Sequence, residues 1–471
     1  MLRTKIICTM GPACDSVAML KEMIKAGMTV ARLNMAHGEL EDHVMRIQNV
    51  RQAAAELNTF VPIMMDIKGP EVRIGKLREA SCELRAGGQL ILTTDEILGD
   101  AERIGVNYAE LNEVVKAGDR ILIDDGLVDL NVREIRGNDI YCDIISGGTL
   151  KPRKGVNLPG IHTTLPGVTE RDVMHIHFGL EQKIEMIAAS FVRKGDDIRE
   201  IRGILAENNA EHVQIYSKIE NQEGMTNLND IIVASDGIMV ARGDLGVEVP
   251  IQDVPMMQKE MIDKCNLAGK PVIVATHMLE SMQVNPRPTR SEVSDVANAV
   301  LQGADVVMLS GESAAGKYPV QSVQTMAAVA QRAETMIDYY EQFSKKRAEH
   351  STNITEVISQ SAVSASLELA AKAIIISTES GFTARMISKY RPQAPIFAVT
   401  QHEEVMAKVC LLSGVIPVKG DAVSTTDEMF ESATRNAINT GYINKGDVIV
   451  LSAGVPIGQS GNTNLLKVQQ V

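Results

Sequence analysis

Two neighbouring stretches decide the fold: Val213-Gln-Ile-Tyr-Ser-Lys-Ile-Glu220 and Gly237-Ile-Met-Val-Ala-Arg-Gly-Asp244. Each begins with an apolar run that predicts a buried strand, and each ends in charged residues. Because side chains alternate along a strand, Lys218 and Glu220 are expected on the same face. Two carboxylates and one ammonium group are therefore predicted at the ends of consecutive strands.

These three side chains suit one kind of chemistry. Carboxylate oxygens are hard ligands that Mg²⁺ prefers, and an adjacent lysine can stabilise a transferring phosphoryl group. A Lys-x-Glu sequence by itself is common, however, and is usually a surface charge pair. The pattern along the rest of the chain has to decide between the two interpretations.

Six further apolar runs extend the same pattern. They are Thr4–Cys8, Thr29–Leu33, Val61–Met65, Glu185–Ala189, Pro271–Ala275 and Ala304–Leu309. Helical stretches such as Ser16–Ala26 and Val254–Ala268 lie between most of the eight predicted strands. Alternating strands and helices indicate an α/β fold with a parallel sheet, and eight such units predict a closed (β/α)8 TIM barrel.

Polar residues follow these apolar runs again and again. They are Arg32, Asn34, Asp66, Lys68, Ser190, Lys218, Glu220, Asp244, Thr276, Ser310 and Glu312. In barrels of this kind the active site lies at the C-terminal ends of the strands. A purely structural barrel would need no such clustering, so the pattern favours an enzyme site over a surface charge pair.

An all-β insert interrupts the third unit. Its apolar period is two, and the predicted strands are Gln89–Thr94, Arg120–Asp124, Leu127–Val132 and Asp139–Ile144, with turn signals at Asp125-Gly126 and Gly137-Asn138. The insert leaves the barrel at the active-site face, so we expect a lid that can hinge there. Its basic segment Lys151–Gly155 is either a solvated loop or a phosphate contact at the rim.

The C-terminal part changes character after a helical stretch that is predicted from Val320 to Arg347. Glu349–Asn353 is a predicted boundary, and a separate α/β domain follows it. Within that domain, Thr378–Thr383 joins a strand to a helix. The hydroxyl groups and free N–H groups there form either an anion site or a simple cap with a glycine turn, and Glu379 would repel a phosphate if it pointed inward.

The predicted domains are therefore a barrel (1–69 and 168–345), a β-barrel lid (70–167) and a C-terminal α/β effector domain (350–471). The 471 residues carry a net charge of −13, which argues against nucleic acid as a partner. The six cysteines have no zinc-type spacing, and the chain has neither a signal peptide nor a run of about 18 apolar residues. A cytoplasmic protein without a membrane partner is expected.

Longer motifs carry a resemblance to the pyruvate kinase family over essentially the whole chain. Arg32-Leu-Asn-Met-Ala-His-Gly38 is similar to the family's R-L-N-F-S-H-G, and Asp66-Ile-Lys-Gly-Pro-Glu-Val-Arg73 is similar to D-T-K-G-P-E-I-R. Residues 154–160, 215–223, 236–248, 275–282, 286–290 and 310–319 match as well. The chain resembles a bacterial short form of the family, without an extra C-terminal domain after Val471.

The resemblance implies the final step of glycolysis, in which phosphoenolpyruvate and ADP give pyruvate and ATP. It implies that Glu220 and Asp244 bind Mg²⁺ or Mn²⁺, and that Lys218 stabilises the moving phosphoryl group. The other implied substrate residues are Arg32, Ser190, Gly243 and Thr276, and the implied nucleotide residues are Arg73, Lys154, Asn34 and His37. Thr276 borders the enolate that gains a proton, but the proton donor is not assigned.

The same resemblance implies a homotetramer and a phosphorylated effector bound at Thr378, Ser380, Gly381 and Thr383. It also implies a K⁺ ion held by an Asn, a Ser, an Asp and a Thr, of which this chain keeps only Asn34 and Asp66. Ala36 replaces the Ser and cannot offer a hydroxyl oxygen, while Ile67 replaces the Thr and keeps only its carbonyl. We therefore expect a weakened K⁺ site. His277, which replaces a common Gln, is a further departure.

Two other functions remain open from the sequence. One is a magnesium-enolate barrel lyase, which would not need a lid that carries Arg73 and Lys154. The other is a catalytically silent effector-binding homologue, which the altered K⁺ motif favours and which the intact Lys218, Glu220 and Asp244 disfavour.

Overall fold

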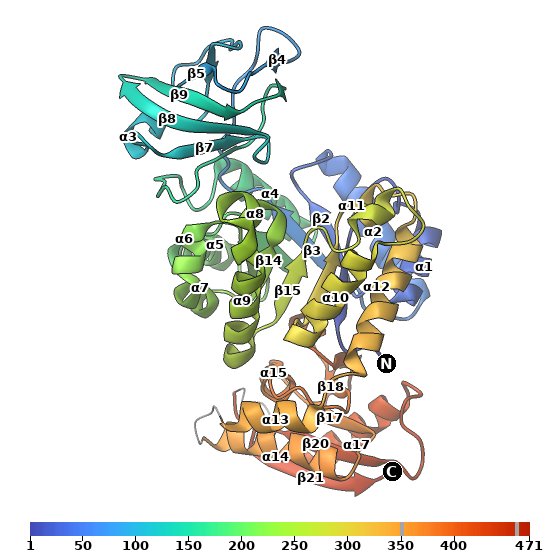
Figure 1. Cartoon of the computed structure of the whole chain (residues 1–471). Coiled ribbons are helices and arrows are strands. Elements are labelled where there is room, and N and C mark those ends of the chain that lie inside the picture. Colours follow the sequence, from blue (N-terminus) through green and yellow to red (C-terminus); the bar gives the residue numbers. More distant parts are fainter. Residues whose placement is uncertain (349–352, 457–460) are drawn as a thin grey trace.

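The computed structural model describes residues 1–348, 353–456 and 461–471. Three bodies follow one another in space: a β lid, a central barrel and an α/β body at the far end (Figure 1). The central body is a closed barrel of eight parallel strands in the order β1-β16-β15-β14-β13-β12-β3-β2. The predicted TIM barrel is thereby confirmed.

Each barrel strand overlaps one of the predicted apolar runs. The strands are β1 (Lys5–Thr9), β2 (Val30–Asn34), β3 (Ile63–Ile67), β12 (Met186–Ala189), β13 (Gln214–Ile219), β14 (Gly237–Ala241), β15 (Val272–Ala275) and β16 (Val306–Leu309). The larger helices around them are α1 (Val17–Ala26), α2 (Leu40–Glu56), α4 (Glu170–Glu181), α5 (Gly195–Glu207), α7 (Leu228–Ala234), α9 (Val254–Ala268), α10 (Arg290–Gln302) and α12 (Pro319–Glu334). Strands that are covered on both faces are apolar throughout, which explains why continuous runs marked them.

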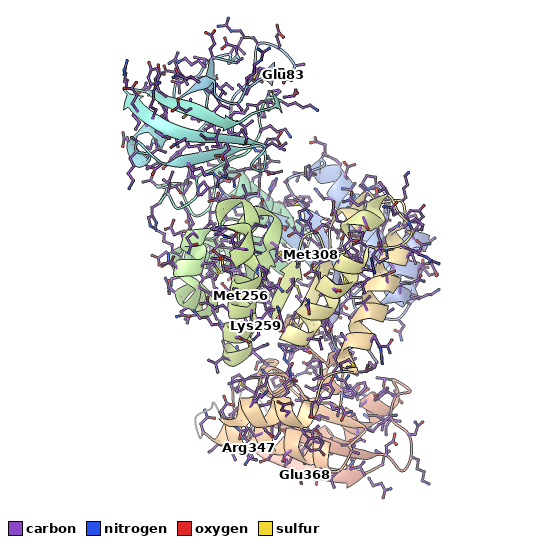
Figure 2. All side chains as sticks on the ribbon, in the orientation of Figure 1. Glu83, Met256, Lys259, Met308, Arg347 and Glu368 are labelled. Carbon is purple, nitrogen blue, oxygen red and sulfur yellow. The ribbon has the colours of Figure 1, made fainter. Side chains whose placement is uncertain are left out.

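The barrel is filled by side chains and is not a pore. One cluster of inward-facing residues includes Ile7, Met64, Tyr216 and Met308, all of them buried. Figure 2 shows Met308 among the strands, whereas Met256, which is 69% exposed, lies on the helical outer layer. With the interior packed in this way, chemistry is left to the residues at the strand ends.

The lid has a hydrophobic core of its own, which includes Leu90, Ile121, Leu130 and Ile140. Its six-stranded sheet has the order β11-β7-β8-β9-β5-β6, and β10 pairs with β4 beside it. The strands are β4 (Cys82–Glu83), β5 (Gln89–Thr93), β6 (Arg103–Gly105), β7 (Arg120–Ile123), β8 (Val128–Arg136), β9 (Asp139–Ser146), β10 (Thr149–Leu150) and β11 (Val156–Asn157), and a short helix α3 (Leu111–Val114) lies among them. The chain that enters the lid joins the two outer strands of the larger sheet, because Arg73 pairs with Gly155 beside β11 and Ile74 pairs with Val106 beside β6. This closure agrees with the predicted β-barrel lid.

The C-terminal body is a five-stranded sheet in the order β19-β18-β17-β20-β21, with β21 antiparallel to β20. Its elements are α13 (Tyr339–Ala348), α14 (Ile354–Glu368), β17 (Ala373–Ser377), α15 (Phe382–Ser388), β18 (Ile396–Thr400), α16 (Glu403–Cys410), β19 (Val415–Lys419), α17 (Thr426–Ile438), β20 (Val448–Ala453) and β21 (Leu465–Gln470). The predicted domain start at residue 350 and all of the predicted boundary at 349–353 except Asn353 lie outside the described residues, and Asn353 caps α14.

The helical stretch predicted from Val320 to about Arg347 consists of two helices, α12 and α13, which residues 335–338 separate. The Thr335 hydroxyl donates to the Arg332 carbonyl at 2.7 Å, and the Asp338 carboxylate accepts from the Glu341 N–H at 2.9 Å. The first contact competes with the helix, and the second satisfies a free N–H group at the start of the next one.

The C-terminal body joins the barrel at the end opposite the lid (Figure 1). Arg391 Nη1 donates to Asp305 Oδ1 at 2.6 Å, just before β16 begins, and Lys5 Nζ donates to the Val415 carbonyl at 2.5 Å. Both contacts lie at the N-terminal ends of barrel strands. Every helix in the described part of the chain is too short or too polar to cross a bilayer.

Candidate active site

Three neighbouring strand ends meet at the Lys218 ammonium group. Lys218 Nζ donates to Ser190 Oγ at 2.7 Å, and it lies 3.3 Å from Asp66 Oδ1 and 3.0 Å from Glu220 Oε1. Asp66 comes from β3, Ser190 follows β12, and Lys218 and Glu220 come from the end of β13. The structure thus brings Lys218 and Glu220 together on one face, as the alternation along the strand predicts.

Arg32 adds a second cation to the same cluster. Its Nε and Nη2 atoms lie 2.7 and 2.6 Å from Asp66 Oδ2, and its Nη1 atom donates to Thr9 Oγ1 at 2.8 Å. Burial alone would raise the pKa of Asp66, but the charges of Arg32 and Lys218 hold it below its usual value. Burial would likewise lower the pKa of Lys218, but Asp66 and Glu220 raise it. Lys218 therefore stays charged at the strand ends.

Glu220 is fully buried and incompletely satisfied. Its Oε2 atom accepts from the Phe191 N–H at 2.5 Å, whereas Oε1, although 3.0 Å from the Lys218 ammonium group, accepts no hydrogen bond of suitable geometry. Burial, followed by the nearby charge of Asp244, raises the pKa of Glu220 to about 8, while Lys218 opposes that shift. A bound cation would satisfy the free oxygen and stabilise the ionised form.

The donor set fits Mg²⁺ rather than an all-protein metal cage. Glu220 and Asp244 supply two carboxylates, and Asp244 lies in the first turn of α8 (Arg242–Glu248). Within residues 1–348, 353–456 and 461–471, no group of three or more His, Cys, Asp or Glu residues gathers as a metal site. Mg²⁺ commonly takes one or two carboxylates and completes its shell with water and substrate oxygens.

Thr276 has a backbone conformation that a β-branched residue rarely adopts. Its φ is +64°, and the next residue, His277, has a φ of +53°. The Thr276 hydroxyl accepts from the Gly243 N–H at 2.8 Å and donates to the Ala275 carbonyl at 2.7 Å. The Arg242 guanidinium donates to the carbonyls of Thr276 and Ala275 at 2.7 and 3.1 Å. These contacts fix the loop that joins the ends of β14 and β15.

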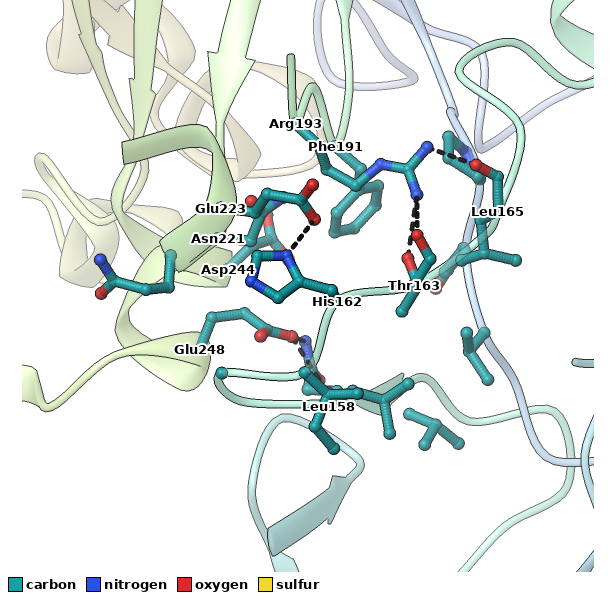
Figure 3. Close-up of a pocket in the computed structure, with 18 of the residues that line it drawn as sticks. Leu158, His162, Thr163, Leu165, Phe191, Arg193, Asn221, Glu223, Asp244 and Glu248 are labelled. Carbon is teal, nitrogen blue, oxygen red and sulfur yellow. Dashed lines mark hydrogen bonds and ion pairs between the residues drawn. The ribbon is translucent and has the colours of Figure 1, made fainter. Parts of the chain in front are cut away.

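A cavity of about 160 Å³ lies between the barrel and the lid, beside Asp244 (Figure 3). Its barrel wall includes Phe191, Arg193, Asn221, Asp244 and Glu248, and its lid wall includes Glu71, Asp125, Asn157, His162 and Thr163. Burial raises the pKa of Asp125, and Asp244 adds to that effect. The lid therefore brings a carboxylate close to the predicted cation site.

The predicted nucleotide residues lie on two bodies. Arg73 and Lys154 belong to the lid, where Arg73 pairs with Glu71 at 2.7 Å and Lys154 pairs with Asp124 at 2.7 Å. Asn34 is the last residue of β2, and His37, which follows the strand, is exposed. Among the described residues, no hydrogen bond or ion pair joins the lid pair to the barrel pair. The nucleotide site stays a prediction.

The K⁺ residues are neighbours, but their oxygens are engaged. Asn34 and Asp66 are paired in register on β2 and β3. The Asn34 side chain accepts from the Ala36 N–H at 3.1 Å, and both Asp66 oxygens contact Arg32, Ser190 or Lys218. Ile67 is buried. A weakened K⁺ site remains a prediction that agrees with these contacts.

The predicted effector loop is a capped glycine turn. The Thr378 hydroxyl accepts from the Gly381 N–H at 3.0 Å, Gly381 has a φ of +80°, and the Thr383 and Thr463 hydroxyls lie 2.9 Å apart. Glu379 points to His402, with Oε2 3.2 Å from Nε2, and Ser380 is half-buried. These contacts fit the cap interpretation, and effector binding at this loop stays a prediction.

The search for polar residues after each strand missed five residues that shape the site: Thr9, Phe191, Arg193, Arg242 and Glu248. Thr9 is the last residue of β1 and fixes Arg32. The other four follow β12 or β14, and most of their hydrogen bonds involve a backbone group of one partner. Extending the search a few residues beyond each strand would have reached Arg193 and Arg242, but it would have shown neither their contacts nor the part of the apolar Phe191.

Two cations and three carboxylates gathered at the strand ends of a closed (β/α)8 barrel define a class of metal-assisted enzymes that act on anionic substrates. Comparison with known families gives the finer assignment. The family model described as "Pyruvate kinase, barrel domain" matches residues 1–323, and "Pyruvate kinase, alpha/beta domain" matches residues 356–469. The chain belongs to the pyruvate kinase family.

Curated relatives agree with this assignment. Pyruvate kinases from Bacillus licheniformis, Geobacillus stearothermophilus and Clostridium acetobutylicum are 51%, 48% and 48% identical to this chain, and each alignment covers 100% of it. The same alignments cover 81%, 80% and 100% of the three relatives.

Proposed function

We propose that the chain transfers the phosphoryl group of phosphoenolpyruvate to ADP and so produces pyruvate and ATP. The observation that carries the proposal is the buried cluster in which Arg32 and Lys218 contact Asp66 beside the incompletely satisfied Glu220. Phosphoryl transfer demands positioning and neutralisation of charge that is spread over three oxygens, and it needs little covalent chemistry from the protein. This cluster supplies both.

The residues divide the work as follows. Arg32, fixed by Thr9 and Asp66, binds the phosphate, and Lys218 neutralises the phosphoryl group as it moves. The Gly243 loop and Thr276 orient the carboxylate end of the substrate. Glu220 and Asp244 would hold Mg²⁺ or Mn²⁺, which supplies further neutralisation of the transferring group when it is bound. Ser190 fixes the Lys218 ammonium group from β12.

The lid completes the site. Arg73 and Lys154 lie on it and meet the nucleotide phosphates, together with Asn34 and His37 from the barrel. Closure of the lid over the strand ends excludes water, which strengthens every electrostatic contact inside. We further propose weakened K⁺ dependence, a phosphorylated effector at Thr378–Thr383 and a homotetramer, all of which rest on the family resemblance.

The decisive experiment measures ADP-dependent pyruvate formation in an assay coupled to NADH oxidation. Wild-type protein should turn over, and Lys218→Met should lose about 10²–10³-fold in kcat while it still binds phosphoenolpyruvate. Lys259→Met is the matched control, because this exposed lysine on α9 pairs only with Asp263 in the described structure. Pyruvate formation from a larger 2-oxo acid, without ADP, would indicate a lyase, and effector binding without any turnover would indicate a silent homologue.

The same assay tests the finer proposals. Replacing K⁺ by a bulky organic cation should leave substantial activity, and complete loss would contradict the weakened site. Candidate sugar phosphates should shift the phosphoenolpyruvate concentration that gives half-maximal rate. The Ser380→Ala variant should respond less, while its rate without effector stays that of wild type.

A further inference from the structure

The chain that returns from the lid to the barrel, residues 156–166, is held by three successive barrel loops (Figure 3). We call it the return segment. After β14, Glu248 Oε1 accepts from Asn157 Nδ2 at 2.9 Å and from the Leu158 N–H at 3.3 Å. After β13, Glu223 lies 3.5 Å from the His162 ring. After β12, Arg193 holds the end of the segment.

Arg193 forms the most extensive of these contacts. Its Nη1 atom donates to the Thr163 hydroxyl at 2.9 Å and to the Thr163 carbonyl at 3.3 Å, and its Nη2 atom donates to the carbonyls of Leu165 and Pro166 at 2.5 and 3.1 Å. The Arg193 residue is only 7% exposed. The His162 side chain is 80% exposed, so solvent screens its ion pair with Glu223. Arg193 is therefore the main anchor of the return segment.

The backbone of Arg193 is fixed to the barrel. Its N–H donates to Asp197 Oδ2 at 2.9 Å, in the first turn of α5, and its carbonyl accepts from Asn227 Nδ2 at 2.8 Å. Because both backbone groups are held, the guanidinium group has a fixed base on the barrel. This side chain consequently ties the lid backbone to a fixed point on the barrel.

The same loop also holds the cation carboxylate. Phe191, two residues before Arg193, donates its N–H to Glu220 Oε2 at 2.5 Å. Phe191 has a φ of +55°, a left-handed conformation that a bulky residue adopts only when its surroundings impose it. A displacement of the loop at Arg193 would move the Phe191 N–H away from Glu220.

We propose that Arg193 is a positioning residue that couples the placement of the lid to the geometry of the Glu220 carboxylate. Its guanidinium group donates hydrogen bonds to the return segment. Its loop keeps the Phe191 N–H hydrogen-bonded to Glu220. Because Glu220 binds a cation only under the proposed function, this role rests on that function. It adds a residue that touches neither substrate nor cation.

The first test measures Mn²⁺ binding without substrate, from the electron paramagnetic resonance signal of the free ion. Residues that orient a metal ligand typically contribute 10–100-fold to metal affinity, so Arg193→Met should bind Mn²⁺ about tenfold more weakly than wild type. Arg193→Lys keeps the charge but loses the forked geometry, and it should fall between the two. The matched control is Arg199→Met, since Arg199 is an exposed residue of α5 that pairs with Asp196 and Asp230.

The second test follows the lid directly. The chain contains no tryptophan, so Ile145→Trp places a single fluorophore on an exposed lid position. In this background, Arg193→Met should increase the amplitude of fast depolarisation in time-resolved anisotropy, because the lid moves more freely. Arg199→Met should leave the anisotropy decay unchanged.

The outcomes separate this role from a purely structural one. A lower melting temperature in Arg193→Met, with unchanged Mn²⁺ affinity and unchanged anisotropy, would overturn the coupling. Weaker Mn²⁺ binding together with greater lid motion, in folded protein, would support it. Pyruvate formation by the wild-type chain decides the proposed function separately, since neither test of Arg193 requires turnover.

Discussion

Thr276 illustrates how single residues shape the rim of the barrel. A β-branched residue with a φ of +64° is strained, and its conformation persists only where other contacts impose it. Arg242 provides them, because its guanidinium group binds the carbonyls of Ala275 and Thr276 and also Asp295 Oδ1 at 2.7 Å. The position of the Thr276 hydroxyl therefore depends on a side chain from the neighbouring strand end.

We predict that Arg242→Met releases this loop. The kcat/KM for phosphoenolpyruvate should fall about 10²-fold, because a misplacement near 1 Å has an effect of that size. Steady-state kinetics measure the loss, and circular dichroism checks that the fold is kept. Arg332→Met, at an exposed position of α12, should retain wild-type kinetics. Equal losses in the two variants would refute a specific role for Arg242.

Sequence reasoning found the charged side chains that the structure gathers at the strand ends. Strand alternation and the strand-end rule locate side chains without tertiary information, so they identified Arg32, Asp66, Lys218 and Glu220. The role of Arg193 could not be predicted, since its partners are mostly backbone carbonyls of residues 163–166, which leave no signature in the sequence. Such supporting contacts exist only once two distant segments have met.

The chain that leaves the barrel for the lid, at Gly69, packs as closely against the barrel as the return segment does. Gly69 has a φ of +70°, its N–H donates to Asp172 Oδ1 at 3.1 Å, and a Cβ atom there would lie 2.5 Å from the Ser190 carbonyl oxygen. Both crossings thus contact the end of β12. A side chain at residue 69 would have to displace either the crossing or Ser190, which holds Lys218.

We predict that Gly69→Ala destabilises the chain more than Gly87→Ala does. Both glycines have positive φ, but a Cβ atom at Gly87 meets no other atom within 4 Å. Gly87→Ala should therefore show only the backbone strain, about 1 kcal/mol, whereas Gly69→Ala should add an overpacking effect of about 1–3 kcal/mol. Urea unfolding measures both, and the coupled assay should show reduced kcat only for Gly69→Ala. Indistinguishable variants would contradict the close fit.

Within the lid, length decided which strands were predictable from the sequence. The eight barrel strands and the four longer lid strands carry enough apolar periodicity to be recognised. The lid strands β4, β6, β10 and β11 have two or three residues each, too few to show a period. The break between α12 and α13 was missed because it depends on two hydrogen bonds from Thr335 and Asp338 and not on a change of period.

On the scale of the whole molecule, the junction between barrel and C-terminal body contains a buried lysine. Burial lowers the pKa of Lys5 from 10.5 to about 8, although Cys410 and the carboxylates of Glu334 and Asp305 act in the opposite direction. Below about pH 8 the lysine is protonated in both folded and unfolded chains. Between about pH 8 and 10.5 the unfolded chain binds more protons, so this residue makes stability rise with pH.

We predict that Lys5→Met removes this pH dependence. Between pH 7.5 and pH 10, the free energy of unfolding of the wild type should rise relative to that of Lys5→Met by an amount on the order of 2–3 kcal/mol. Urea unfolding at the two pH values measures the difference, and Lys25→Met, on the exposed face of α1, should retain the wild-type pH dependence. A constant difference between wild type and Lys5→Met would show that Lys5 does not titrate in this window.

The three bodies were predictable as separate units, because each change of apolar period marks a change of architecture. The placement of the three bodies relative to one another was harder to predict. The strand-end rule placed the lid at the active-site face, but nothing in the sequence located the C-terminal body at the opposite end. That arrangement depends on single contacts, such as Arg391 with Asp305 and Lys5 with Val415, between residues far apart in the chain.

The closure of the barrel has a consequence for biosynthesis. The barrel closes only when β1 pairs with β16, for example Lys5 with Val306, and β16 is the last barrel strand to be synthesised. The lid, by contrast, makes all its strand pairings within residues 73–157, while five barrel strands are still to be translated. Local pairings form sooner than distant ones, so we expect the lid to fold during synthesis, before the barrel over which it lies can close.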